Sequence, residues 1–161
     1  MEVREAIAGQ WLDRVLRTHP GEAVRFLSGE TDPFRNPVGF TIRQALDVLL
    51  DELLLGMDTG KVTAALDSIV QIRAVQDFTP SQALEFLFQL KAILRGHDLG
   101  PSQDLLDSRI DEMALQAFDL YVKYRERTYQ VKANEARRQV YVLERSAGLR
   151  VPATSRERGG K

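Results

Sequence analysis

Residues 102–147 read SQDLLDSRIDEMALQAFDLYVKYRERTYQVKANEARRQVYVLERSA and contain neither proline nor glycine. Most of these residues favour helix, so the stretch predicts one continuous helix. At about 1.5 Å per residue, this helix is roughly 69 Å long. A compact globule of this chain length is only about 40 Å across. The sequence therefore predicts a long C-terminal helix that projects beyond its own domain and whose apolar positions need a partner.

Two apolar stripes follow one another along this stretch. The first steps by 4-3-4-3 residues and suits packing on the domain; its members are Ile110, Ala114, Ala117, Tyr121 and Tyr124. After a slip near residues 125–128, a second stripe has heptad spacing, and its members are Tyr129, Ala133, Ala136, Val140, Leu143 and Ala147. Its small alanines allow two helices to approach closely. Because the simplest partner for an exposed heptad stripe is a copy of itself, we predict a homodimer through this second stripe, the dimer seam.

The rest of the chain also has a helical pattern, which predicts an all-α fold. Apolar residues recur every three or four positions, and Pro, Gly and capping residues separate the segments. The expected helices are 3–18, 20–27, 42–55, 61–76 and 80–95, with a loop at 29–39 and a disordered tail at 148–161. Thr41 with Gln44, and Thr79 with Gln82, match capping boxes at the start of two helices. We expect a globin-like or related bundle of five to six helices, with residues 1–147 as one domain.

Composition limits the class of protein. A chain of 161 residues with 43% hydrophobic and 28% charged residues is typical of one globular domain with an appendage. The N-terminal MEVREAIAGQW lacks the pattern of a signal peptide, and no apolar stretch is long enough to span a membrane. The absence of cysteine excludes disulfides and thiol chemistry. We therefore predict a cytoplasmic protein that does not contact a membrane.

Charge is unevenly distributed along the chain. Residues 121–161 hold eleven Lys and Arg against four Glu, whereas the first 120 residues hold eleven basic and nineteen acidic groups. The basic residues between 124 and 138 alternate with tyrosines, which superficially suits nucleic acid. Glu126, Glu135 and Glu144 interrupt this pattern, however, and no compact helix-turn-helix precedes it. We favour a solvated helix surface and do not expect nucleic acid as the partner.

One corner of the predicted bundle is unusually polar. Residues 73–83 read RAVQDFTPSQA, which places Arg73, Gln76 and Asp77 in the last turn of one helix, just before the capped start of the next. Two interpretations stay open. In the first, Asp77 and Thr79 cap the second helix and Arg73 pairs with a carboxylate. In the second, Arg73, Gln76 and Asp77 line a polar ligand pocket at a helix N-terminus, which favours anions.

No catalytic or metal-binding pattern accompanies this corner. The sequence has no phosphate-binding loop, HExxH, GxGxxG or GxSxG motif. The two histidines, His19 and His97, lie at a helix end and in a glycine-rich break, not in an apolar cluster where a haem ligand would sit. We predict no catalytic residue, no metal and no cofactor.

Three segments resemble a known family: Asn36–Gly39 (NPVG), Ile72–Leu87 (IRAVQDFTPSQALEFL) and Ala117–Arg138 (AFDLYVKYRERTYQVKANEARR). They resemble the N-terminal domain of RsbRD-type RsbT co-antagonists, and the likeness extends over about residues 5–146. The resemblance implies a sensory module related to the non-haem, globin-like domains of stressosome proteins, which dimerise and signal through a long helix to a C-terminal STAS domain. Because the sequence ends soon after its long helix, we expect a stand-alone member without a STAS domain. Phosphorylation-controlled release of a switch kinase is therefore not carried over.

Together these observations favour a non-enzymatic cytoplasmic sensor or adaptor in signalling. We expect a homodimer that relays a small-molecule or protein signal through its C-terminal helix to another protein in trans. A globin-like protein that binds a small molecule or cofactor is the first alternative. A helical dimer that binds nucleic acid is the second.

Overall fold

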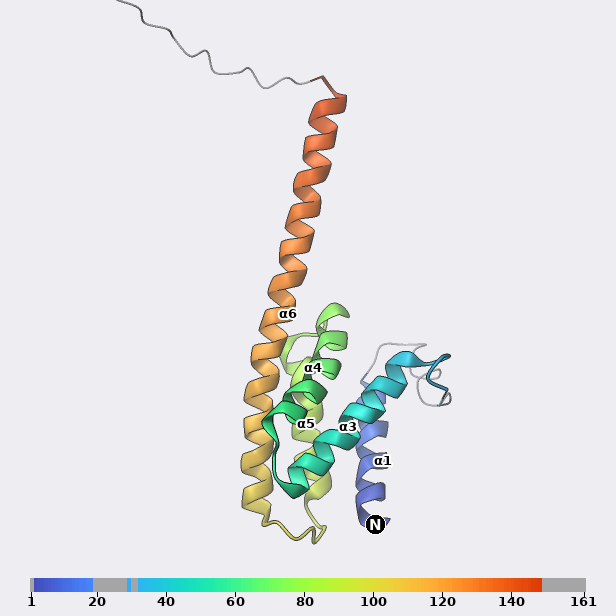
Figure 1. Ribbon diagram of the computed structural model, residues 1–161, viewed down its shortest axis with the longest axis vertical. Coiled ribbons are helices and arrows are strands. Elements are labelled where there is room, and N and C mark those ends of the chain that lie inside the picture. Colours follow the sequence, from blue (N-terminus) through green and yellow to red (C-terminus); the bar gives the residue numbers. More distant parts are fainter. Residues whose placement is uncertain (1, 19–28, 30–31, 149–161) are drawn as a thin grey trace, which may run out of the picture. The chain divides into compact units, whose positions relative to one another are not determined.

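The computed structural model describes residues 2–18, 29 and 32–148 of the chain (Figure 1). These residues contain α-helices and no strand, which confirms the predicted all-α class. The helices are α1 (Glu2–Arg17), α3 (Pro37–Leu55), α4 (Thr59–Val75), α5 (Pro80–Leu94) and α6 (Gln103–Ser146). The helix predicted at 20–27 and the tail after Gly148 lie outside the described residues. The relation to globins stays a prediction.

The chain divides into two units, Met1–Arg125 and Glu126–Lys161. The first contains α1, α3, α4, α5 and the N-terminal half of α6, here called the inner half, residues 103–125. The second contains the C-terminal half of α6, the outer half, residues 126–146.

A single hydrophobic core holds the first unit together. Each helix contributes side chains with no exposed surface, among them Trp11, Leu49, Leu66, Leu87 and Ile110. Helix α3 packs against α4, and α1 packs against both α3 and α5. The indole N–H of Trp11 donates to the Phe86 carbonyl oxygen at 2.7 Å, so this large side chain is buried with its polar atom satisfied.

Helix α3 begins five residues earlier than predicted. Its N-cap is Asn36, whose side-chain oxygen accepts a hydrogen bond from the Gly39 backbone N–H at 2.9 Å, and Pro37 occupies the first helical position. The predicted capping box of Thr41 with Gln44 is therefore wrong, because an Asn-Pro start satisfies the free amides one turn earlier. Gly39 belongs to this cap and not to a loop: a Cβ at this position would lie 2.2 Å from the Asn36 side-chain nitrogen.

The starts of α4 and α5 are close to those predicted. Asp58 caps α4 by accepting from the Lys61 backbone N–H. At α5, Thr79 and Gln82 form the predicted capping box, with the Thr79 hydroxyl accepting from the Gln82 backbone and the Gln82 side chain accepting from the Thr79 backbone. The local sequence signal therefore places the beginning of α5 correctly.

The inner half of α6 uses the first predicted stripe to enter the core. Its buried members are Ile110, Ala114, Ala117 and Tyr121, and Tyr124 is half-buried against the same core. Polar contacts add to this packing: Lys91 Nζ lies 2.6 Å from Asp111 Oδ1, and the Tyr124 hydroxyl donates to Asp67 Oδ1 at 2.6 Å. The predicted role of the first stripe in packing on the domain is confirmed.

The outer half of α6 has a different environment. Every residue from Tyr129 to Gly148 is exposed. The large side chains of the dimer seam share this exposure, with 59% for Tyr129, 53% for Val140 and 67% for Leu143. No described residue of the chain therefore covers these apolar positions.

Candidate functional site

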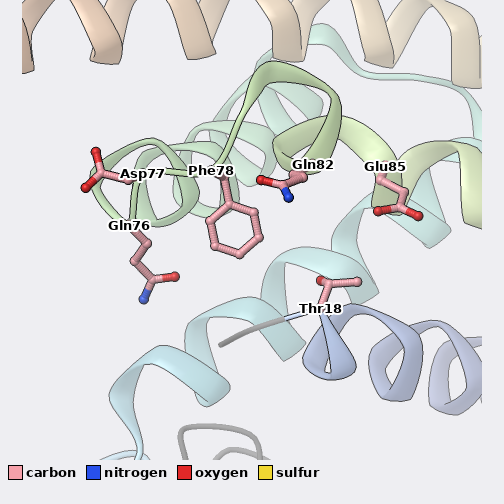
Figure 2. Close-up of a pocket in the computed structure, with 6 residues that line it drawn as sticks. All are labelled: Thr18, Gln76, Asp77, Phe78, Gln82 and Glu85. Atoms are coloured by element: carbon pink, nitrogen blue, oxygen red, sulfur yellow. The ribbon is translucent and has the colours of Figure 1, made fainter. Parts of the chain in front are cut away.

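The candidate site is the corner between α4 and α5. Helix α4 ends at Val75, and Asp77 adopts a left-handed conformation with φ of 59°, which turns the chain before the capped start of α5. This turn brings the end of α4 and the first turns of α5 beside Thr18 at the end of α1 (Figure 2). They enclose a pocket of about 300 Å³. The described residues that line it are Thr18, Gln76, Asp77, Phe78, Gln82 and Glu85.

The pocket combines one aromatic ring with several polar groups. Figure 2 shows the Phe78 ring pointing from the corner toward Thr18, while the Asp77 carboxylate points away from that ring. Phe78 is buried at 7% exposure, whereas Gln82 and Glu85 are exposed on the first two turns of α5. The arrangement suits a small polar ligand that makes hydrogen bonds at the rim of the pocket and touches the small exposed part of the Phe78 ring.

Arg73 is the buried charge behind this pocket. Its side chain has no exposed surface, and its guanidinium lies 5.2 Å from the ring centres of both Phe78 and Phe86. Nη1 donates to the Gln82 carbonyl oxygen at 2.8 Å, and Nη2 donates to the Thr18 hydroxyl at 3.0 Å. Arg73 therefore joins α1, α4 and the start of α5 in one network.

The predicted pairing of Arg73 with a carboxylate is wrong. Among the described residues its partners are carbonyl oxygens and a hydroxyl, and its Nε has no hydrogen-bond partner. Burial lowers the pKa of Arg73 to about 10, against a smaller opposing effect of the Glu85 charge. The guanidinium therefore remains charged at neutral pH, inside the protein and next to the pocket.

The three predicted ligand-binding residues take different positions. Gln76 and Asp77 line the pocket, whereas Arg73 lies behind it and reaches it through Thr18. Asp77 does not cap α5, since Thr79 does. Phe78, Glu85 and Thr18 also line the pocket, although no sequence pattern singles them out. Thr18 follows α1 and lies far from the corner in sequence.

Direct hydrogen bonds connect the corner to the inner half of α6. The Tyr121 hydroxyl donates to the Phe78 carbonyl oxygen. Arg125 Nη1 lies 3.0 Å from Asp77 Oδ1 and also donates to the Ala74 carbonyl oxygen at 3.3 Å. Two of the pocket residues, Asp77 and Phe78, are thus held by α6 at the last two turns of its inner half.

The described residues contain neither a candidate metal site nor a candidate membrane-spanning helix. No group of three or more His, Asp or Glu side chains in residues 2–18, 29 and 32–148 is arranged to hold a metal ion. Within the same part of the chain, no helix has both the length and the apolar character needed to cross a membrane.

Comparison with known proteins identifies the family. No curated protein and no solved structure shows a significant match to the chain. A family model, described as the RsbT co-antagonist protein RsbRD N-terminal domain, matches residues 5–136. The matched region includes the α4–α5 corner, the inner half of α6 and part of the dimer seam. Because the match covers most of the chain, the chain belongs to the RsbRD N-terminal domain family.

Proposed function

We propose that this chain is a non-enzymatic, homodimeric signalling module of the cytoplasm in which α6 relays a signal from the α4–α5 corner to a protein in trans. Membership of the RsbRD N-terminal domain family supports the sensory or signalling role. The observation that carries the relay is the pair of contacts from Tyr121 and Arg125 to the pocket residues Phe78 and Asp77. In this proposal residues 1–147 act as one domain, with the whole of α6 as its output element.

The input of the relay is an occupant of the corner pocket, either a small molecule or a segment of a partner. An occupant that contacts the Phe78 ring or the Asp77 backbone changes the position of groups that hold α6. Such a ligand shifts the equilibrium between two states of the corner, and with it the conformation of α6. The shift can be no larger than the difference between the ligand's affinities for the two states. The contacts of Tyr121 and Arg125 are the groups through which this difference acts.

The exposed apolar residues of α6 support the homodimer. Leu115 and Val122 are 72% and 38% exposed, although they lie on the inner half. They precede Tyr129 at intervals of seven residues, so they share the heptad position of Tyr129, Ala136 and Leu143. In this proposal the seam starts before the predicted slip. A second copy is a partner that would cover the same positions on both chains.

The dimer is tested by light scattering with two matched double variants. Ala136→Glu with Val140→Glu places four carboxylates in the seam of a dimer, and we expect monomers. Val131→Glu with Val142→Glu adds the same charge at exposed positions outside the seam, and we expect a dimer. An unchanged dimer in the first variant would contradict the seam, and monomers in both would show that charge alone disperses the chain.

The input is tested by native mass spectrometry of freshly purified chain, with a denatured control. A bound mass that denaturation releases supports a small-molecule input, and Glu85→Lys, which reverses a charge in the pocket wall, should then lose that mass. A dimer of bare chain mass supports a protein input. A bound mass that Glu85→Lys retains would contradict the corner pocket as its site.

A further inference from the structure

The outer half of α6 exposes more apolar surface than a dimer seam accounts for. Residues 140–143 are Val, Tyr, Val and Leu, and their exposed fractions are 53%, 63%, 60% and 67%. Four consecutive helical residues at 100° each point in directions that span most of the helix circumference. Such a run of exposed apolar residues on a surface helix is normally avoided unless it has a function.

A two-stranded seam covers only half of this run. Val140 and Leu143 belong to the heptad seam, at the positions that face the partner helix. Tyr141 and Val142 occupy neighbouring positions that stay exposed when the seam is closed. They are therefore available for a second contact, on the side of α6 that faces away from the seam.

Two arginines complete a defined patch around Tyr141 and Val142. Arg138 and Arg145 lie three residues before Tyr141 and three residues after Val142, so the four positions follow the i, i+3, i+4, i+7 spacing of one helix face. We call this face the outer patch; it consists of Arg138, Tyr141, Val142 and Arg145. In the described part of the chain neither arginine has a hydrogen bond or an ion pair through its side chain. A shallow groove of about 380 Å³ beside the patch includes Arg138 and Val142 in its lining and extends past Glu135 and Gln139 to Leu143 of the seam.

We propose that the outer patch is a docking surface for an acidic amphipathic segment of a separate protein. Tyr and Arg are the side chains that most often dominate binding energy at protein interfaces. An apolar pair between two cations is complementary to an apolar residue between two carboxylates. This inference rests on the proposed function, since it names the surface through which the dimer contacts a protein in trans.

The charges argue against two other occupants. If the patch docked on the same patch of another dimer, in either direction, arginines would lie against arginines. Nucleic acid presents a continuous line of phosphates that would pass Glu135 and Glu144 as well as the arginines, whereas a short segment can place its carboxylates at the two arginines alone. A partner segment that carries acidic residues satisfies the arginines and covers the apolar pair at once.

The test uses a synthetic helical peptide as the probe. The peptide carries Leu and Phe on one face with Glu on both sides, and a second peptide has Lys in place of every Glu. Fluorescence anisotropy with the full chain should show about tenfold tighter binding of the Glu peptide. Arg138→Glu with Arg145→Glu should reverse this preference, and Tyr141→Ser with Val142→Ser should weaken binding of the Glu peptide about tenfold.

A matched variant and the oligomeric state separate the possible causes. Arg95→Glu with Lys123→Glu changes the net charge equally but outside the patch, and should leave the preference unchanged. Light scattering on every variant reports the dimer independently, so loss of peptide binding with an intact dimer concerns the patch alone. If the chain is monomeric yet shows the expected preference for the Glu peptide, the predicted dimer seam is wrong and the outer patch is still supported.

Three results would overturn the proposal. The first is equal or absent binding of the two peptides by the unmodified chain. The second is a tetramer that Tyr141→Ser with Val142→Ser dissociates, since the patch would then be covered by another copy. The third is binding of a DNA duplex in preference to the Glu peptide, lost on Arg138→Glu with Arg145→Glu.

Discussion

The two halves of α6 use similar side chains in opposite ways. The inner half places leucine, isoleucine and tyrosine in the core of its own unit, with Leu106 at 2% exposure and Ile110 at 0%. The outer half carries valine, tyrosine and leucine at comparable helical spacing, yet every residue from 129 to 146 is exposed. Helical periodicity therefore tells which residues form a face. It does not tell whether that face is buried within the same chain.

The largest expected difference between the halves comes from the same substitution at two leucines. Leu106→Ala removes a buried side chain and should lower the free energy of unfolding of the bundle by about 3 kcal/mol. Leu143→Ala, at 67% exposure, should change it by less than about 0.5 kcal/mol in the monomer.

Urea denaturation followed by circular dichroism measures both leucine variants, at a protein concentration that keeps the chain monomeric. At high concentration Leu143→Ala should lower the melting temperature, because it weakens an association that stabilises the folded chain. Equal losses at both positions in the monomer would mean that the outer half is covered within the chain.

A second comparison removes one hydroxyl from each half. Tyr121→Phe leaves the buried Phe78 carbonyl without its donor, which should cost about 1.5 kcal/mol. Tyr141→Phe, at 63% exposure, should cost nearly nothing in the monomer. Thermal unfolding gives both values. A neutral Tyr121→Phe would show that water replaces the lost donor and that this contact does not hold the corner.

The helices themselves were largely predictable from sequence, because apolar spacing and the Thr79 capping box are local signals. The start of α3 was not, since Gly39 suggests a loop although it is the residue that leaves room for the Asn36 cap. The candidate pocket was predicted only in part. Gln76 and Asp77 lie in one polar segment, but Thr18 joins them through packing that no local pattern encodes.

The error at Arg73 has a general physical reason. A charged side chain in a sequence suggests an opposite charge nearby, and one of the two interpretations of this corner paired Arg73 with a carboxylate. The structure instead satisfies it with the ends of two helices and a hydroxyl. Backbone carbonyls are present at every residue, so sequence cannot show which of them will surround a buried guanidinium.

A fall in pH should destabilise the first unit, which contains the inner half of α6, through protonation of Glu52. The Asp58 backbone N–H and the Lys61 ammonium hold the pKa of this carboxyl below its ordinary value of 4.5. Because the folded pKa is the lower one, Glu52 stabilises the fold above pH 4.5, and this contribution is lost as the pH falls through the folded pKa. Arg109 of α6 donates to the carbonyl of Leu53, the residue next to Glu52. Loosening of the connection between α3 and α4 should therefore also affect the inner half.

Amide hydrogen exchange, measured as a function of pH, compares the acid sensitivity of the two halves of α6. Between pH 5 and pH 3, protection of residues 103–125 should fall, and Glu52→Gln should lower that protection at pH 7 and flatten its dependence on pH below pH 5. Exchange also depends on pH chemically, so each value is taken relative to the unfolded chain at the same pH. An unchanged pH dependence in Glu52→Gln would assign the acid sensitivity to other carboxyls.

A smaller effect on stability than at Leu106 or Tyr121 is expected at the contact nearest to the boundary between the halves. Asp77→Asn keeps a residue type that tolerates the left-handed conformation but removes the ion pair with Arg125. Asp77 is largely exposed, so the pair should be worth only about 0.5 kcal/mol and should weaken with salt. Urea denaturation at low and high salt should therefore show a difference from the unmodified chain only at low salt.

The same variant decides whether the corner communicates with the outer half. If the Asp77–Arg125 pair is part of a relay, Asp77→Asn should alter hydrogen exchange in residues 126–146 by more than its small effect on stability explains. The control is Lys91→Met, which removes the Lys91–Asp111 pair of the inner half and should not alter this exchange. Both variants remove one ion pair to α6 and differ chiefly in whether that pair touches the pocket. If the two variants change the outer half equally, the corner serves only the stability of the bundle. The signal would then have to enter through the dimer seam itself.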